Sequence, residues 1–391
     1  MTTPCKLMKS RRRFLISGIR KCSRATDLFL AVVVCFTLIA CSDKDPGALS
    51  SDANSPYPQS NLITGVSFDW SSHVRYAHGS DNWPITWADD DNQYTTWGDG
   101  GGFGGSNRKG RVSLGIARVE GPADAYRGYN VWGGVNAERT AQFTGKSYGI
   151  ISIDHTLYVW RSGAGSNTTA YDFQQLFKSG DHGRTWVGAD WRFTGEDGFF
   201  IPTFLQFGRD YASARDGYVY IYAPNLKTDQ WEIHRPGDIG LIRVPNDRLF
   251  DRESYQFFAG TEPDGKPVWT AQVRDRKPVF VDAINGVMCT SAIYNSGLGK
   301  YLLVTEHSQL AKGNIGIYEA PEPWGPWSTV LFQTGFGVPH VQANTFFWNF
   351  SNKWTSADGQ RFTLLFTGHD ANDSWNTVEG RFRMSDKNVS K

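Results

Sequence analysis

Two aspartates, Asp81 and Asp99, have the residue type and the spacing to carry out acid–base chemistry. Asp81 precedes a short apolar segment, and Asp99 comes eighteen residues later, directly after the next such segment. A pair of carboxyl groups can divide the work: one protonates a leaving oxygen, and the other activates water or attacks a sugar. We expect Asp99 to be the acid and Asp81 the base, with the roles exchangeable, because a carboxyl near a second one has a raised pKa. Inversion would need the carboxyls about 6.5–9.5 Å apart.

Other polar and aromatic residues could bind a substrate beside these acids. A tryptophan face can stack on the apolar face of a sugar ring, and Trp83 lies only two residues from Asp81. Histidines could bind hydroxyl groups, and the chain has neither an H-E-x-x-H motif nor paired cysteines at metal-site spacing. The predicted substrate-binding residues are His78, Trp83, Asp197, Glu306, His307, His340 and Trp375.

The first forty residues read as an export signal. They hold eight basic residues against one acidic residue, followed by an uncharged apolar run over residues 28–40. Thirteen residues are too few for a permanent membrane span but suit a signal-peptide core. The run ends Leu38-Ile39-Ala40-Cys41, which resembles a bacterial lipobox. We therefore expect a signal peptide over 1–40 and a lipidated Cys41. The protein would then be exported and anchored to the outer membrane or cell surface, on the periplasmic or extracellular side.

Removing this leader changes the charge balance of the chain. The full 391 residues contain 40 basic and 39 acidic residues, and the 351 that remain contain 32 and 38, a net charge of −6. An acidic body argues against nucleic-acid binding. Cys289 is the one cysteine left besides Cys41, so no disulfide is expected, and its apolar neighbours predict a buried thiol. Residues 41–61, rich in Ser, Asp, Pro and Gly, predict a flexible tether.

The rest of the chain, residues 62–391, predicts an all-β protein. Short runs of β-branched and aromatic residues alternate with Gly, Asp, Asn and Pro turns, and helix-period patterns are nearly absent. One hairpin pattern recurs five times, with 61 to 81 residues between the aromatics that open each second strand. Such a period, with strands alone, predicts a five-bladed β-propeller of about four strands per blade. The five hairpins span 84–97, 149–160, 203–222, 289–304 and 345–366.

Propeller geometry sorts the acids by face. Loops before the first strand and after the second strand of a blade share one face, and the tight turns between those strands lie on the other. Asp81 and Asp99 then share a face, whereas the turn acids, Asp89 to Asp91 among them, lie opposite and are explained by turn formation. We predict no cofactor and no metal ligand. A calcium ion in the central channel, or at the Asp89–Asp91 turn, is left open.

One segment has a structural signature of its own. Residues 179–186, Ser-Gly-Asp-His-Gly-Arg-Thr-Trp, fit the Asp-box pattern S-x-D-x-G-x-T-W. In this motif the aspartate caps a hairpin between outer strands of a propeller blade, and the tryptophan packs between blades. Asp181 is therefore expected to be structural.

The segment around the two aspartates resembles a known family. Asp81 ahead of Pro84-Ile85-Thr86-Trp87, followed by residues 94–99, Tyr-Thr-Thr-Trp-Gly-Asp, is similar to the opening of a bacterial glycoside hydrolase family. That family was long catalogued as a domain of unknown function and includes endo-D-arabinanases. The resemblance implies a five-bladed propeller in which Asp81 and Asp99 are the catalytic pair. Gly100 departs from the family, where a hydroxyl residue usually follows the Gly-Asp.

Together these observations predict an exported glycoside hydrolase that cleaves a polysaccharide, an arabinan or another furanoside glycan. We expect a monomer whose partners are this glycan and, through its lipid, a membrane. Two alternatives stay open: a polysaccharide lyase, with Arg161 or Arg209 neutralising a uronate and His307 or Tyr148 as base, and a sugar-binding lipoprotein without catalysis. The release of unsaturated products would identify a lyase, and binding without new reducing ends would identify a sugar-binding protein.

Overall fold

A computed structural model describes residues 54–163, 170–341, 345–368 and 373–386. The predicted signal peptide and Cys41 lie outside these ranges. In the described part of the chain, strands dominate, and the helical segments are short 3₁₀ turns: η1 (Arg209–Tyr211), η2 (Arg252–Ser254) and η3 (Val273–Asp275). None of the described segments is a helix with the length and apolar character to cross a membrane.

The first two blades follow each other along the chain as antiparallel sheets. Blade 1 contains β2 (Ile85–Trp87), β3 (Gln93–Gly98), β4 (Leu114–Glu120) and β5 (Arg127–Trp132). Blade 2 contains β6 (Lys146–Ile153), β7 (Thr156–Ser162), β8 (Phe173–Ser179), β9 (Val187–Gly188) and β10 (Phe193–Thr194).

The next two blades are joined by a short parallel pairing between their first strands, β11 and β17. Blade 3 contains β11 (Thr203–Gln206), β12 (Tyr218–Pro224), β13 (Gly237–Pro245), β14 (Gln256–Thr261), β15 (Pro267–Thr270) and β16 (Pro278–Asp282). Blade 4 contains β17 (Thr290–Asn295), β18 (Lys300–Glu306), β19 (Ile315–Ala320) and β20 (Ser328–Gln333).

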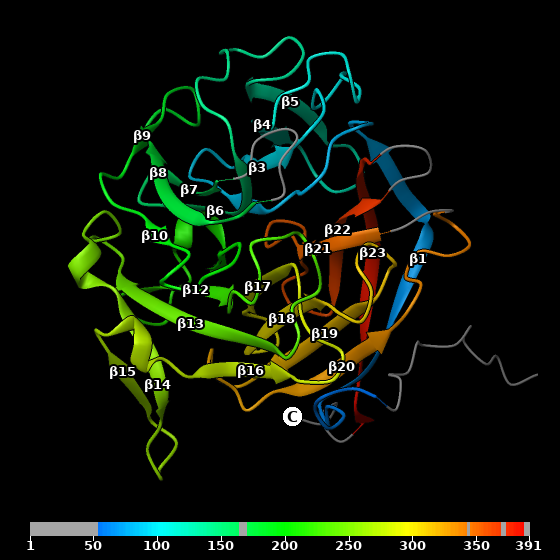
Figure 1. Cartoon of the computed structure of the whole chain (residues 1–391). Helices are drawn as coiled ribbons and strands as arrows, with labels where there is room; N and C mark the ends of the chain where they lie inside the picture. Colours follow the sequence, from blue (N-terminus) through cyan, green and yellow to red (C-terminus); the bar gives the residue numbers. More distant parts are fainter. Residues whose placement is uncertain (1–53, 164–169, 342–344, 369–372, 387–391) are drawn as a thin grey trace, which may run out of the picture. The chain divides into compact units, whose positions relative to one another are not determined.

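Blade 5 closes the ring with a strand from the beginning of the described chain. Its own strands are β21 (Thr345–Phe350), β22 (Arg361–Gly368) and β23 (Trp375–Met384), and β1 (Ile63–Tyr76) pairs antiparallel with β23 as the outermost strand. Figure 1 shows β1 beside β23 at the rim, with β17 and β21 near the centre. The prediction of a five-bladed all-β propeller is confirmed, and each predicted hairpin forms the first two strands of a blade.

The inner strands are buried on both faces because each blade packs between two others. Every residue of β3, β6 and β21 is buried, and their β-branched and aromatic content suits such strands. We call the face formed by loops before the first strand and after the second strand of each blade the site face. The opposite face, which carries the tight turns between those two strands, is the turn face.

The Asp-box is structural, as predicted. The Asp181 carboxylate accepts hydrogen bonds from the backbone N–H groups of Arg184 and Thr185 and from the Ser179 hydroxyl. Trp186 packs against a hydrophobic cluster that includes residues of blade 1. Cys289 is a buried free thiol, also as predicted.

The predicted tether ends earlier than residue 61. Tyr57 packs on Phe280 and Tyr318 with ring centroids 5.0 and 5.9 Å away. The Ser60 hydroxyl donates to Glu319 Oε1 at 2.8 Å. Serine and proline content alone suggested flexibility here, but one aromatic side chain and these hydrogen bonds attach the segment to blade 4.

Candidate functional site

The site face brings Asp81 and Asp99 onto neighbouring chain segments. The Asp81 N–H donates to the Gly98 carbonyl at 2.9 Å, and the Gly98 N–H donates to the Asp81 carbonyl at 2.7 Å. This is a hydrogen-bonded antiparallel pair, in which the two Cα atoms lie about 5.5 Å apart. Asp81 therefore forms an isolated bridge to the end of β3, beyond the β2–β3 ladder, and Asp99 is the next residue after that bridge.

Gly98 makes room for the Asp81 carboxyl. A Cβ atom at residue 98 would lie 2.6 Å from Asp81 Oδ1, 2.9 Å from Asn82 Nδ2 and 3.2 Å from Lys146 Cδ. Asn82 Nδ2 also donates to Asp81 Oδ1 at 2.8 Å. The absence of a side chain at residue 98 thus allows a carboxyl, an amide and a lysine stem to meet at one point.

Asp99 is held by two cations. Lys146 Nζ lies 2.5 Å from its Oδ1, and Arg111 Nη2 lies 2.9 Å from its Oδ2. Its backbone has a left-handed φ of 51°, which interrupts the alternation of side-chain directions along an extended strand. The ion pairs bind Asp99 as a carboxylate.

Asp81 has the opposite electrostatic environment. Burial raises the pKa of its carboxyl well above the usual range; Lys146 opposes this effect, and the negative charges of Asp373 and Asp99 add to it. The two predicted catalytic acids therefore differ in their surroundings, since one is desolvated and the other is paired with two cations.

An apolar cluster from blades 2 to 5 lies near the aspartates. Its members come from the starts of inner strands and the adjoining loops on the site face: Tyr148, Tyr171, Phe200, Ile201, Met288, Cys289, Phe346 and Phe347. The charge of Asp81 acts on the pKa of both Tyr148 and Cys289, so the cluster adjoins that carboxyl. We infer that this apolar surface contributes to the desolvation of Asp81.

The site face also carries strained backbone. Asn82, Ile201 and Phe347 have left-handed φ angles of 57°, 34° and 49°. Such conformations cost about 1–3 kcal/mol each for residues other than glycine and cluster at functional sites. Their presence around the two acids marks this face as a candidate site.

Trp83 and Trp375 are not sugar platforms, and both predictions were wrong. Each has 0 % exposure, and their rings pack against each other with centroids 5.3 Å apart. Trp83 also contacts Trp97 and Phe103. The left-handed φ of Asn82 interrupts the strand alternation after Asp81, and Trp83 enters the contact between blades 1 and 5.

Glu306 and His307 lie at the end of β18 but cannot reach a substrate in this structure. Glu306 is fully buried, and its Oε1 accepts the Ala311 N–H at 2.5 Å. The His307 ring is buried and stacks on Phe332 with centroids 3.8 Å apart. Prediction of both as substrate-binding residues was wrong, because the 308–314 loop covers this strand end.

The remaining predicted binding residues are scattered. His78 is exposed three residues before Asp81. His340 stacks on Trp70 of the outermost strand, with centroids 4.9 Å apart. Asp197 accepts the Thr194 N–H in a turn at the outer edge of blade 2. Only His78 lies close to the acids along the chain, and the substrate-binding roles of His340 and Asp197 stay predictions.

The residues proposed for a lyase do not gather at one site. Tyr148 is fully buried, and Arg161 donates to the Thr144 carbonyl and lies over Phe173. Arg209 donates to the Asp89 carbonyl on the turn face. Tyr148 and Arg161 lie on the paired strands β6 and β7, but the contacts of Arg161 named above are with other residues.

Sequence reasoning missed three charged residues of the site: Lys146, Arg111 and Asp373. Lys146 begins the first strand of blade 2, and Asp373 follows the second strand of blade 5. Both positions obey the same face rule that selected Asp81 and Asp99. The sequence reasoning looked only for acidic catalytic residues, so it did not consider Lys146 and Arg111.

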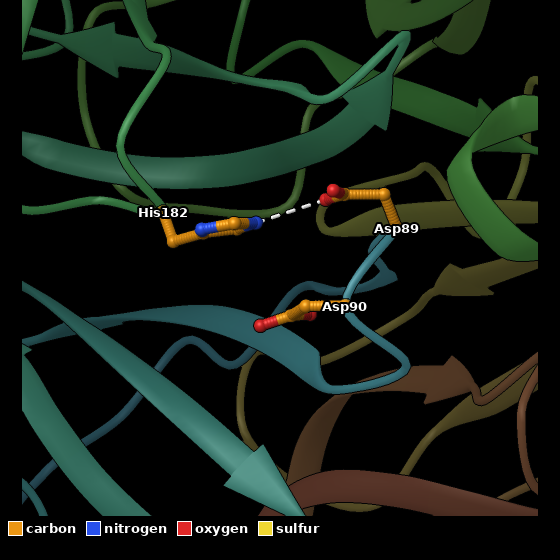
Figure 2. Close-up of side chains that lie close together, drawn as sticks. All are labelled: Asp89, Asp90 and His182. Atoms are coloured by element: carbon orange, nitrogen blue, oxygen red, sulfur yellow. Dashed lines mark hydrogen bonds and ion pairs between the residues drawn. The ribbon is translucent and has the colours of Figure 1, made fainter.

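The turn face carries a separate cluster of ionisable groups. Asp89, Asp90 and His182 each offer a ligand atom within 4.8 Å of the others, the only such group of three found among the described residues (Figure 2). Asp89 accepts hydrogen bonds from His182 Nε2 and His155 Nδ1, both at 2.9 Å. Asp90 accepts from the Tyr94 hydroxyl and from Asn92. These contacts tie blade 1 to blade 2.

One cavity of the described structure is lined by neither of the two acids. It has a volume of about 670 Å³ and lies between blades 5 and 1. Its walls come from a bulge in β1, the neighbouring strands of blade 5 and the turn after β4. Cavity volume therefore does not select Asp81 and Asp99 as the functional site. They are candidates because of their chemistry and their electrostatic environment.

Comparison with known proteins adds a family and a fold likeness. Residues 148–343 match the family described as a domain of unknown function, DUF4185. This agrees with the resemblance expected from the sequence, although the matched residues begin after Asp81 and Asp99. No curated protein matches the chain.

Several solved structures are similar to the chain at low sequence identity. A GH43_1 enzyme from Xanthomonas citri is 12 % identical with a TM-score of 0.45, over 78 % of this chain and 87 % of that one. The RS223 beta-xylosidase is 13 % identical with a TM-score of 0.47, over 79 % and 97 %. A protein of unknown function from Dyadobacter fermentans is 8 % identical with a TM-score of 0.45, over 82 % and 100 %.

Proposed function

The chain belongs to the DUF4185 family, and from this membership and the geometry of the site face we propose that it is a glycoside hydrolase. The observation that carries the proposal is the pair Asp81 and Asp99, two neighbouring carboxyls in opposite electrostatic environments. Asp81 is half-buried, and its desolvation favours the protonated form. The other is bound by Lys146 and Arg111 as a carboxylate. Hydrolysis of a glycosidic bond needs one acid in each state.

The environment of each carboxyl favours one division of roles. Asp81 supplies the proton to the leaving oxygen, because desolvation raises its pKa and so favours its protonated form. Asp99 is the ionised partner that activates water or attacks the sugar. This is the reverse of the first assignment made from the sequence, which treated the roles as exchangeable. The sequence had no signal for burial at residue 81 or for the lysine beside residue 99.

The substrate we propose is a polysaccharide outside the cytoplasm, an arabinan or another furanoside glycan. Support for the location comes from the basic leader, the apolar run and the Leu38-Ile39-Ala40-Cys41 sequence. Support for the furanoside comes from the resemblance of residues 81–99 to a family that includes endo-D-arabinanases. Lipid attachment at Cys41 would hold the enzyme at the membrane that faces this glycan.

Activity on a panel of arabinans, other furanosides and uronic-acid polysaccharides tests the proposal. Reducing ends and ultraviolet absorbance are read together, with the wild type, Asp81→Asn and Asp99→Asn. We expect new reducing ends from the wild type on a furanoside glycan, no rise in ultraviolet absorbance, and a loss of about 10²-fold or more in each variant. Undiminished cleavage by both variants would remove the pair from the mechanism.

A further inference from the structure

Lys146 is a buried cation placed between the two acids. It is 5 % exposed, although lysine is almost never fully buried unless it is paired. Its Nζ lies 2.5 Å from Asp99 Oδ1. Its stem passes Gly98 at the point where the Asp81 carboxyl also approaches that glycine. One ammonium therefore acts on both carboxyls, by contact with Asp99 and through space on Asp81.

The charges around Asp81 balance when one carboxyl is protonated. Three carboxyls take part, Asp81, Asp99 and Asp373, and two cations, Lys146 and Arg111. Among the described residues, Asp81 also acts on Tyr148, Tyr171 and Cys289, whose pKa values are raised chiefly by burial, so they are uncharged at neutral pH. Both cations contact Asp99, and burial raises the pKa of Asp81, so the shared proton belongs on Asp81 in preference to Asp99.

We propose that Lys146 is a positioning residue that holds Asp99 as the carboxylate and so leaves the single proton of the pair on Asp81. The inference depends on the proposed function, because it concerns how that site is prepared for catalysis. Lys146 does not itself transfer a proton. Its ammonium fixes which acid is the donor before a substrate arrives.

Replacing this lysine should move the whole pH–rate profile toward alkaline pH. An opposite charge within about 4–6 Å lowers a carboxyl pKa by about 1–3, so Lys146→Met, which removes the ammonium 2.5 Å from Asp99 Oδ1, should move the acidic limb by about that amount. It should also raise the pKa of Asp81, which Lys146 lowers. On the acidic side of its shifted pH–rate profile, the variant should lose about tenfold or more in activity relative to the wild type. The variant should regain activity at higher pH. A merely structural role would lower activity equally at all pH values.

Two variants control this experiment. Lys146→Arg keeps a charge at the same place and should keep the wild-type pH profile. Arg111→Met removes the other partner of Asp99, but that side chain is 31 % exposed. Solvent screens a partly exposed charge more strongly, so its shift should be smaller than that of Lys146→Met.

A second measurement does not depend on activity. NMR titration of protein labelled with ¹³C at aspartate Cγ follows each carboxyl directly, with the Asp81 and Asp99 signals identified by their loss in Asp81→Asn and Asp99→Asn. We expect Lys146→Met to raise the midpoint of the Asp99 signal. If Lys146→Met does not fold, Lys146→Gln serves instead, with the same rise expected in the midpoint of the Asp99 signal.

These results separate the two claims. If the titrations behave as expected but no glycan is cleaved, the proton placement stands and the proposed function fails. If glycan is cleaved but neither the profile nor the carboxyl midpoints move in Lys146→Met, the inference about Lys146 is overturned and the proposed function stands.

Discussion

Glu306 allows a prediction that needs no substrate. Its carboxyl is fully buried at the end of β18, and burial raises its pKa from 4.5 to about 8; a hydrogen bond from the Ala311 N–H opposes the effect. A hydrogen bond with the Cys289 thiol opposes the effect of burial as well. The folded protein therefore holds this side chain as a neutral acid over a pH range in which the unfolded chain ionises it.

The sign of the effect on stability follows from this difference. Below about pH 4.5 both states are protonated, and the residue adds no pH dependence. Between about pH 4.5 and 8 folding must take up a proton, so wild-type stability falls as pH rises, and above about pH 8 the loss is complete. One unit of pKa difference corresponds to about 1.4 kcal/mol, so the full loss is on the order of 5 kcal/mol. Water entering near Glu306 would reduce it.

Glu306→Gln copies the neutral acid in shape and cannot ionise. We expect its free energy of unfolding, relative to wild type, to rise by about 1.4 kcal/mol per pH unit from about pH 5 to 8 and to level off above that. Urea unfolding followed by tryptophan fluorescence at several pH values measures it. Glu262→Gln, at an exposed turn, controls for the loss of a carboxyl. A difference that does not change with pH would refute the reasoning, because Glu306 would then ionise normally in the folded protein.

Three further predictions follow from contacts in the structure. Gly98→Ala should lower kcat by about 10²-fold, because its Cβ would displace the Asp81 carboxyl; Gly217→Ala, with open space around its Cβ, should be neutral in the same assay. Trp83→Ala should lower the free energy of unfolding, measured in urea, by about 3–5 kcal/mol because the ring is fully buried. A loss of substrate affinity without a loss of stability would instead support the prediction that Trp83 stacks on a sugar. The pKa of Asp89 is lowered because hydrogen bonds from His155 and His182 outweigh the opposite effect of burial, and Asp89 in turn raises the pKa of His155. Asp89→Asn should therefore lower Tm most at mildly acidic pH, with the loss shrinking as pH rises through the raised pKa of His155; an equal loss at pH 5 and pH 9 would contradict this.

Much of the fold could be read from the sequence because propeller hairpins leave local signals. Each inner pair of strands joins two apolar runs through a short turn, so Tyr94, Tyr158 and Phe362 mark second strands without any long-range information. The closing strand β1 left no such signal. Its partner β23 lies about 300 residues away along the chain, and only the folded ring brings them together.

The site was predictable in part, for the same reason. Asp81 and Asp99 were found by counting loops on one face. Trp83 was misjudged because the backbone of Asn82 interrupts the strand alternation, and no residue type announces a left-handed φ with certainty. Lys146 was missed because burial and ion pairing arise only when blades 1 and 2 pack together.

The central claim is that Asp81 and Asp99 together cleave a glycosidic bond. Its most direct test is the rate of reducing-end release from a furanoside polysaccharide by the wild type, Asp81→Asn, Asp99→Asn and the double variant, all confirmed as folded. We predict that each single variant loses about 10²-fold or more and that the double variant loses little beyond the larger single loss, since the two groups act as a unit. Wild-type rates in the double variant would contradict the claim.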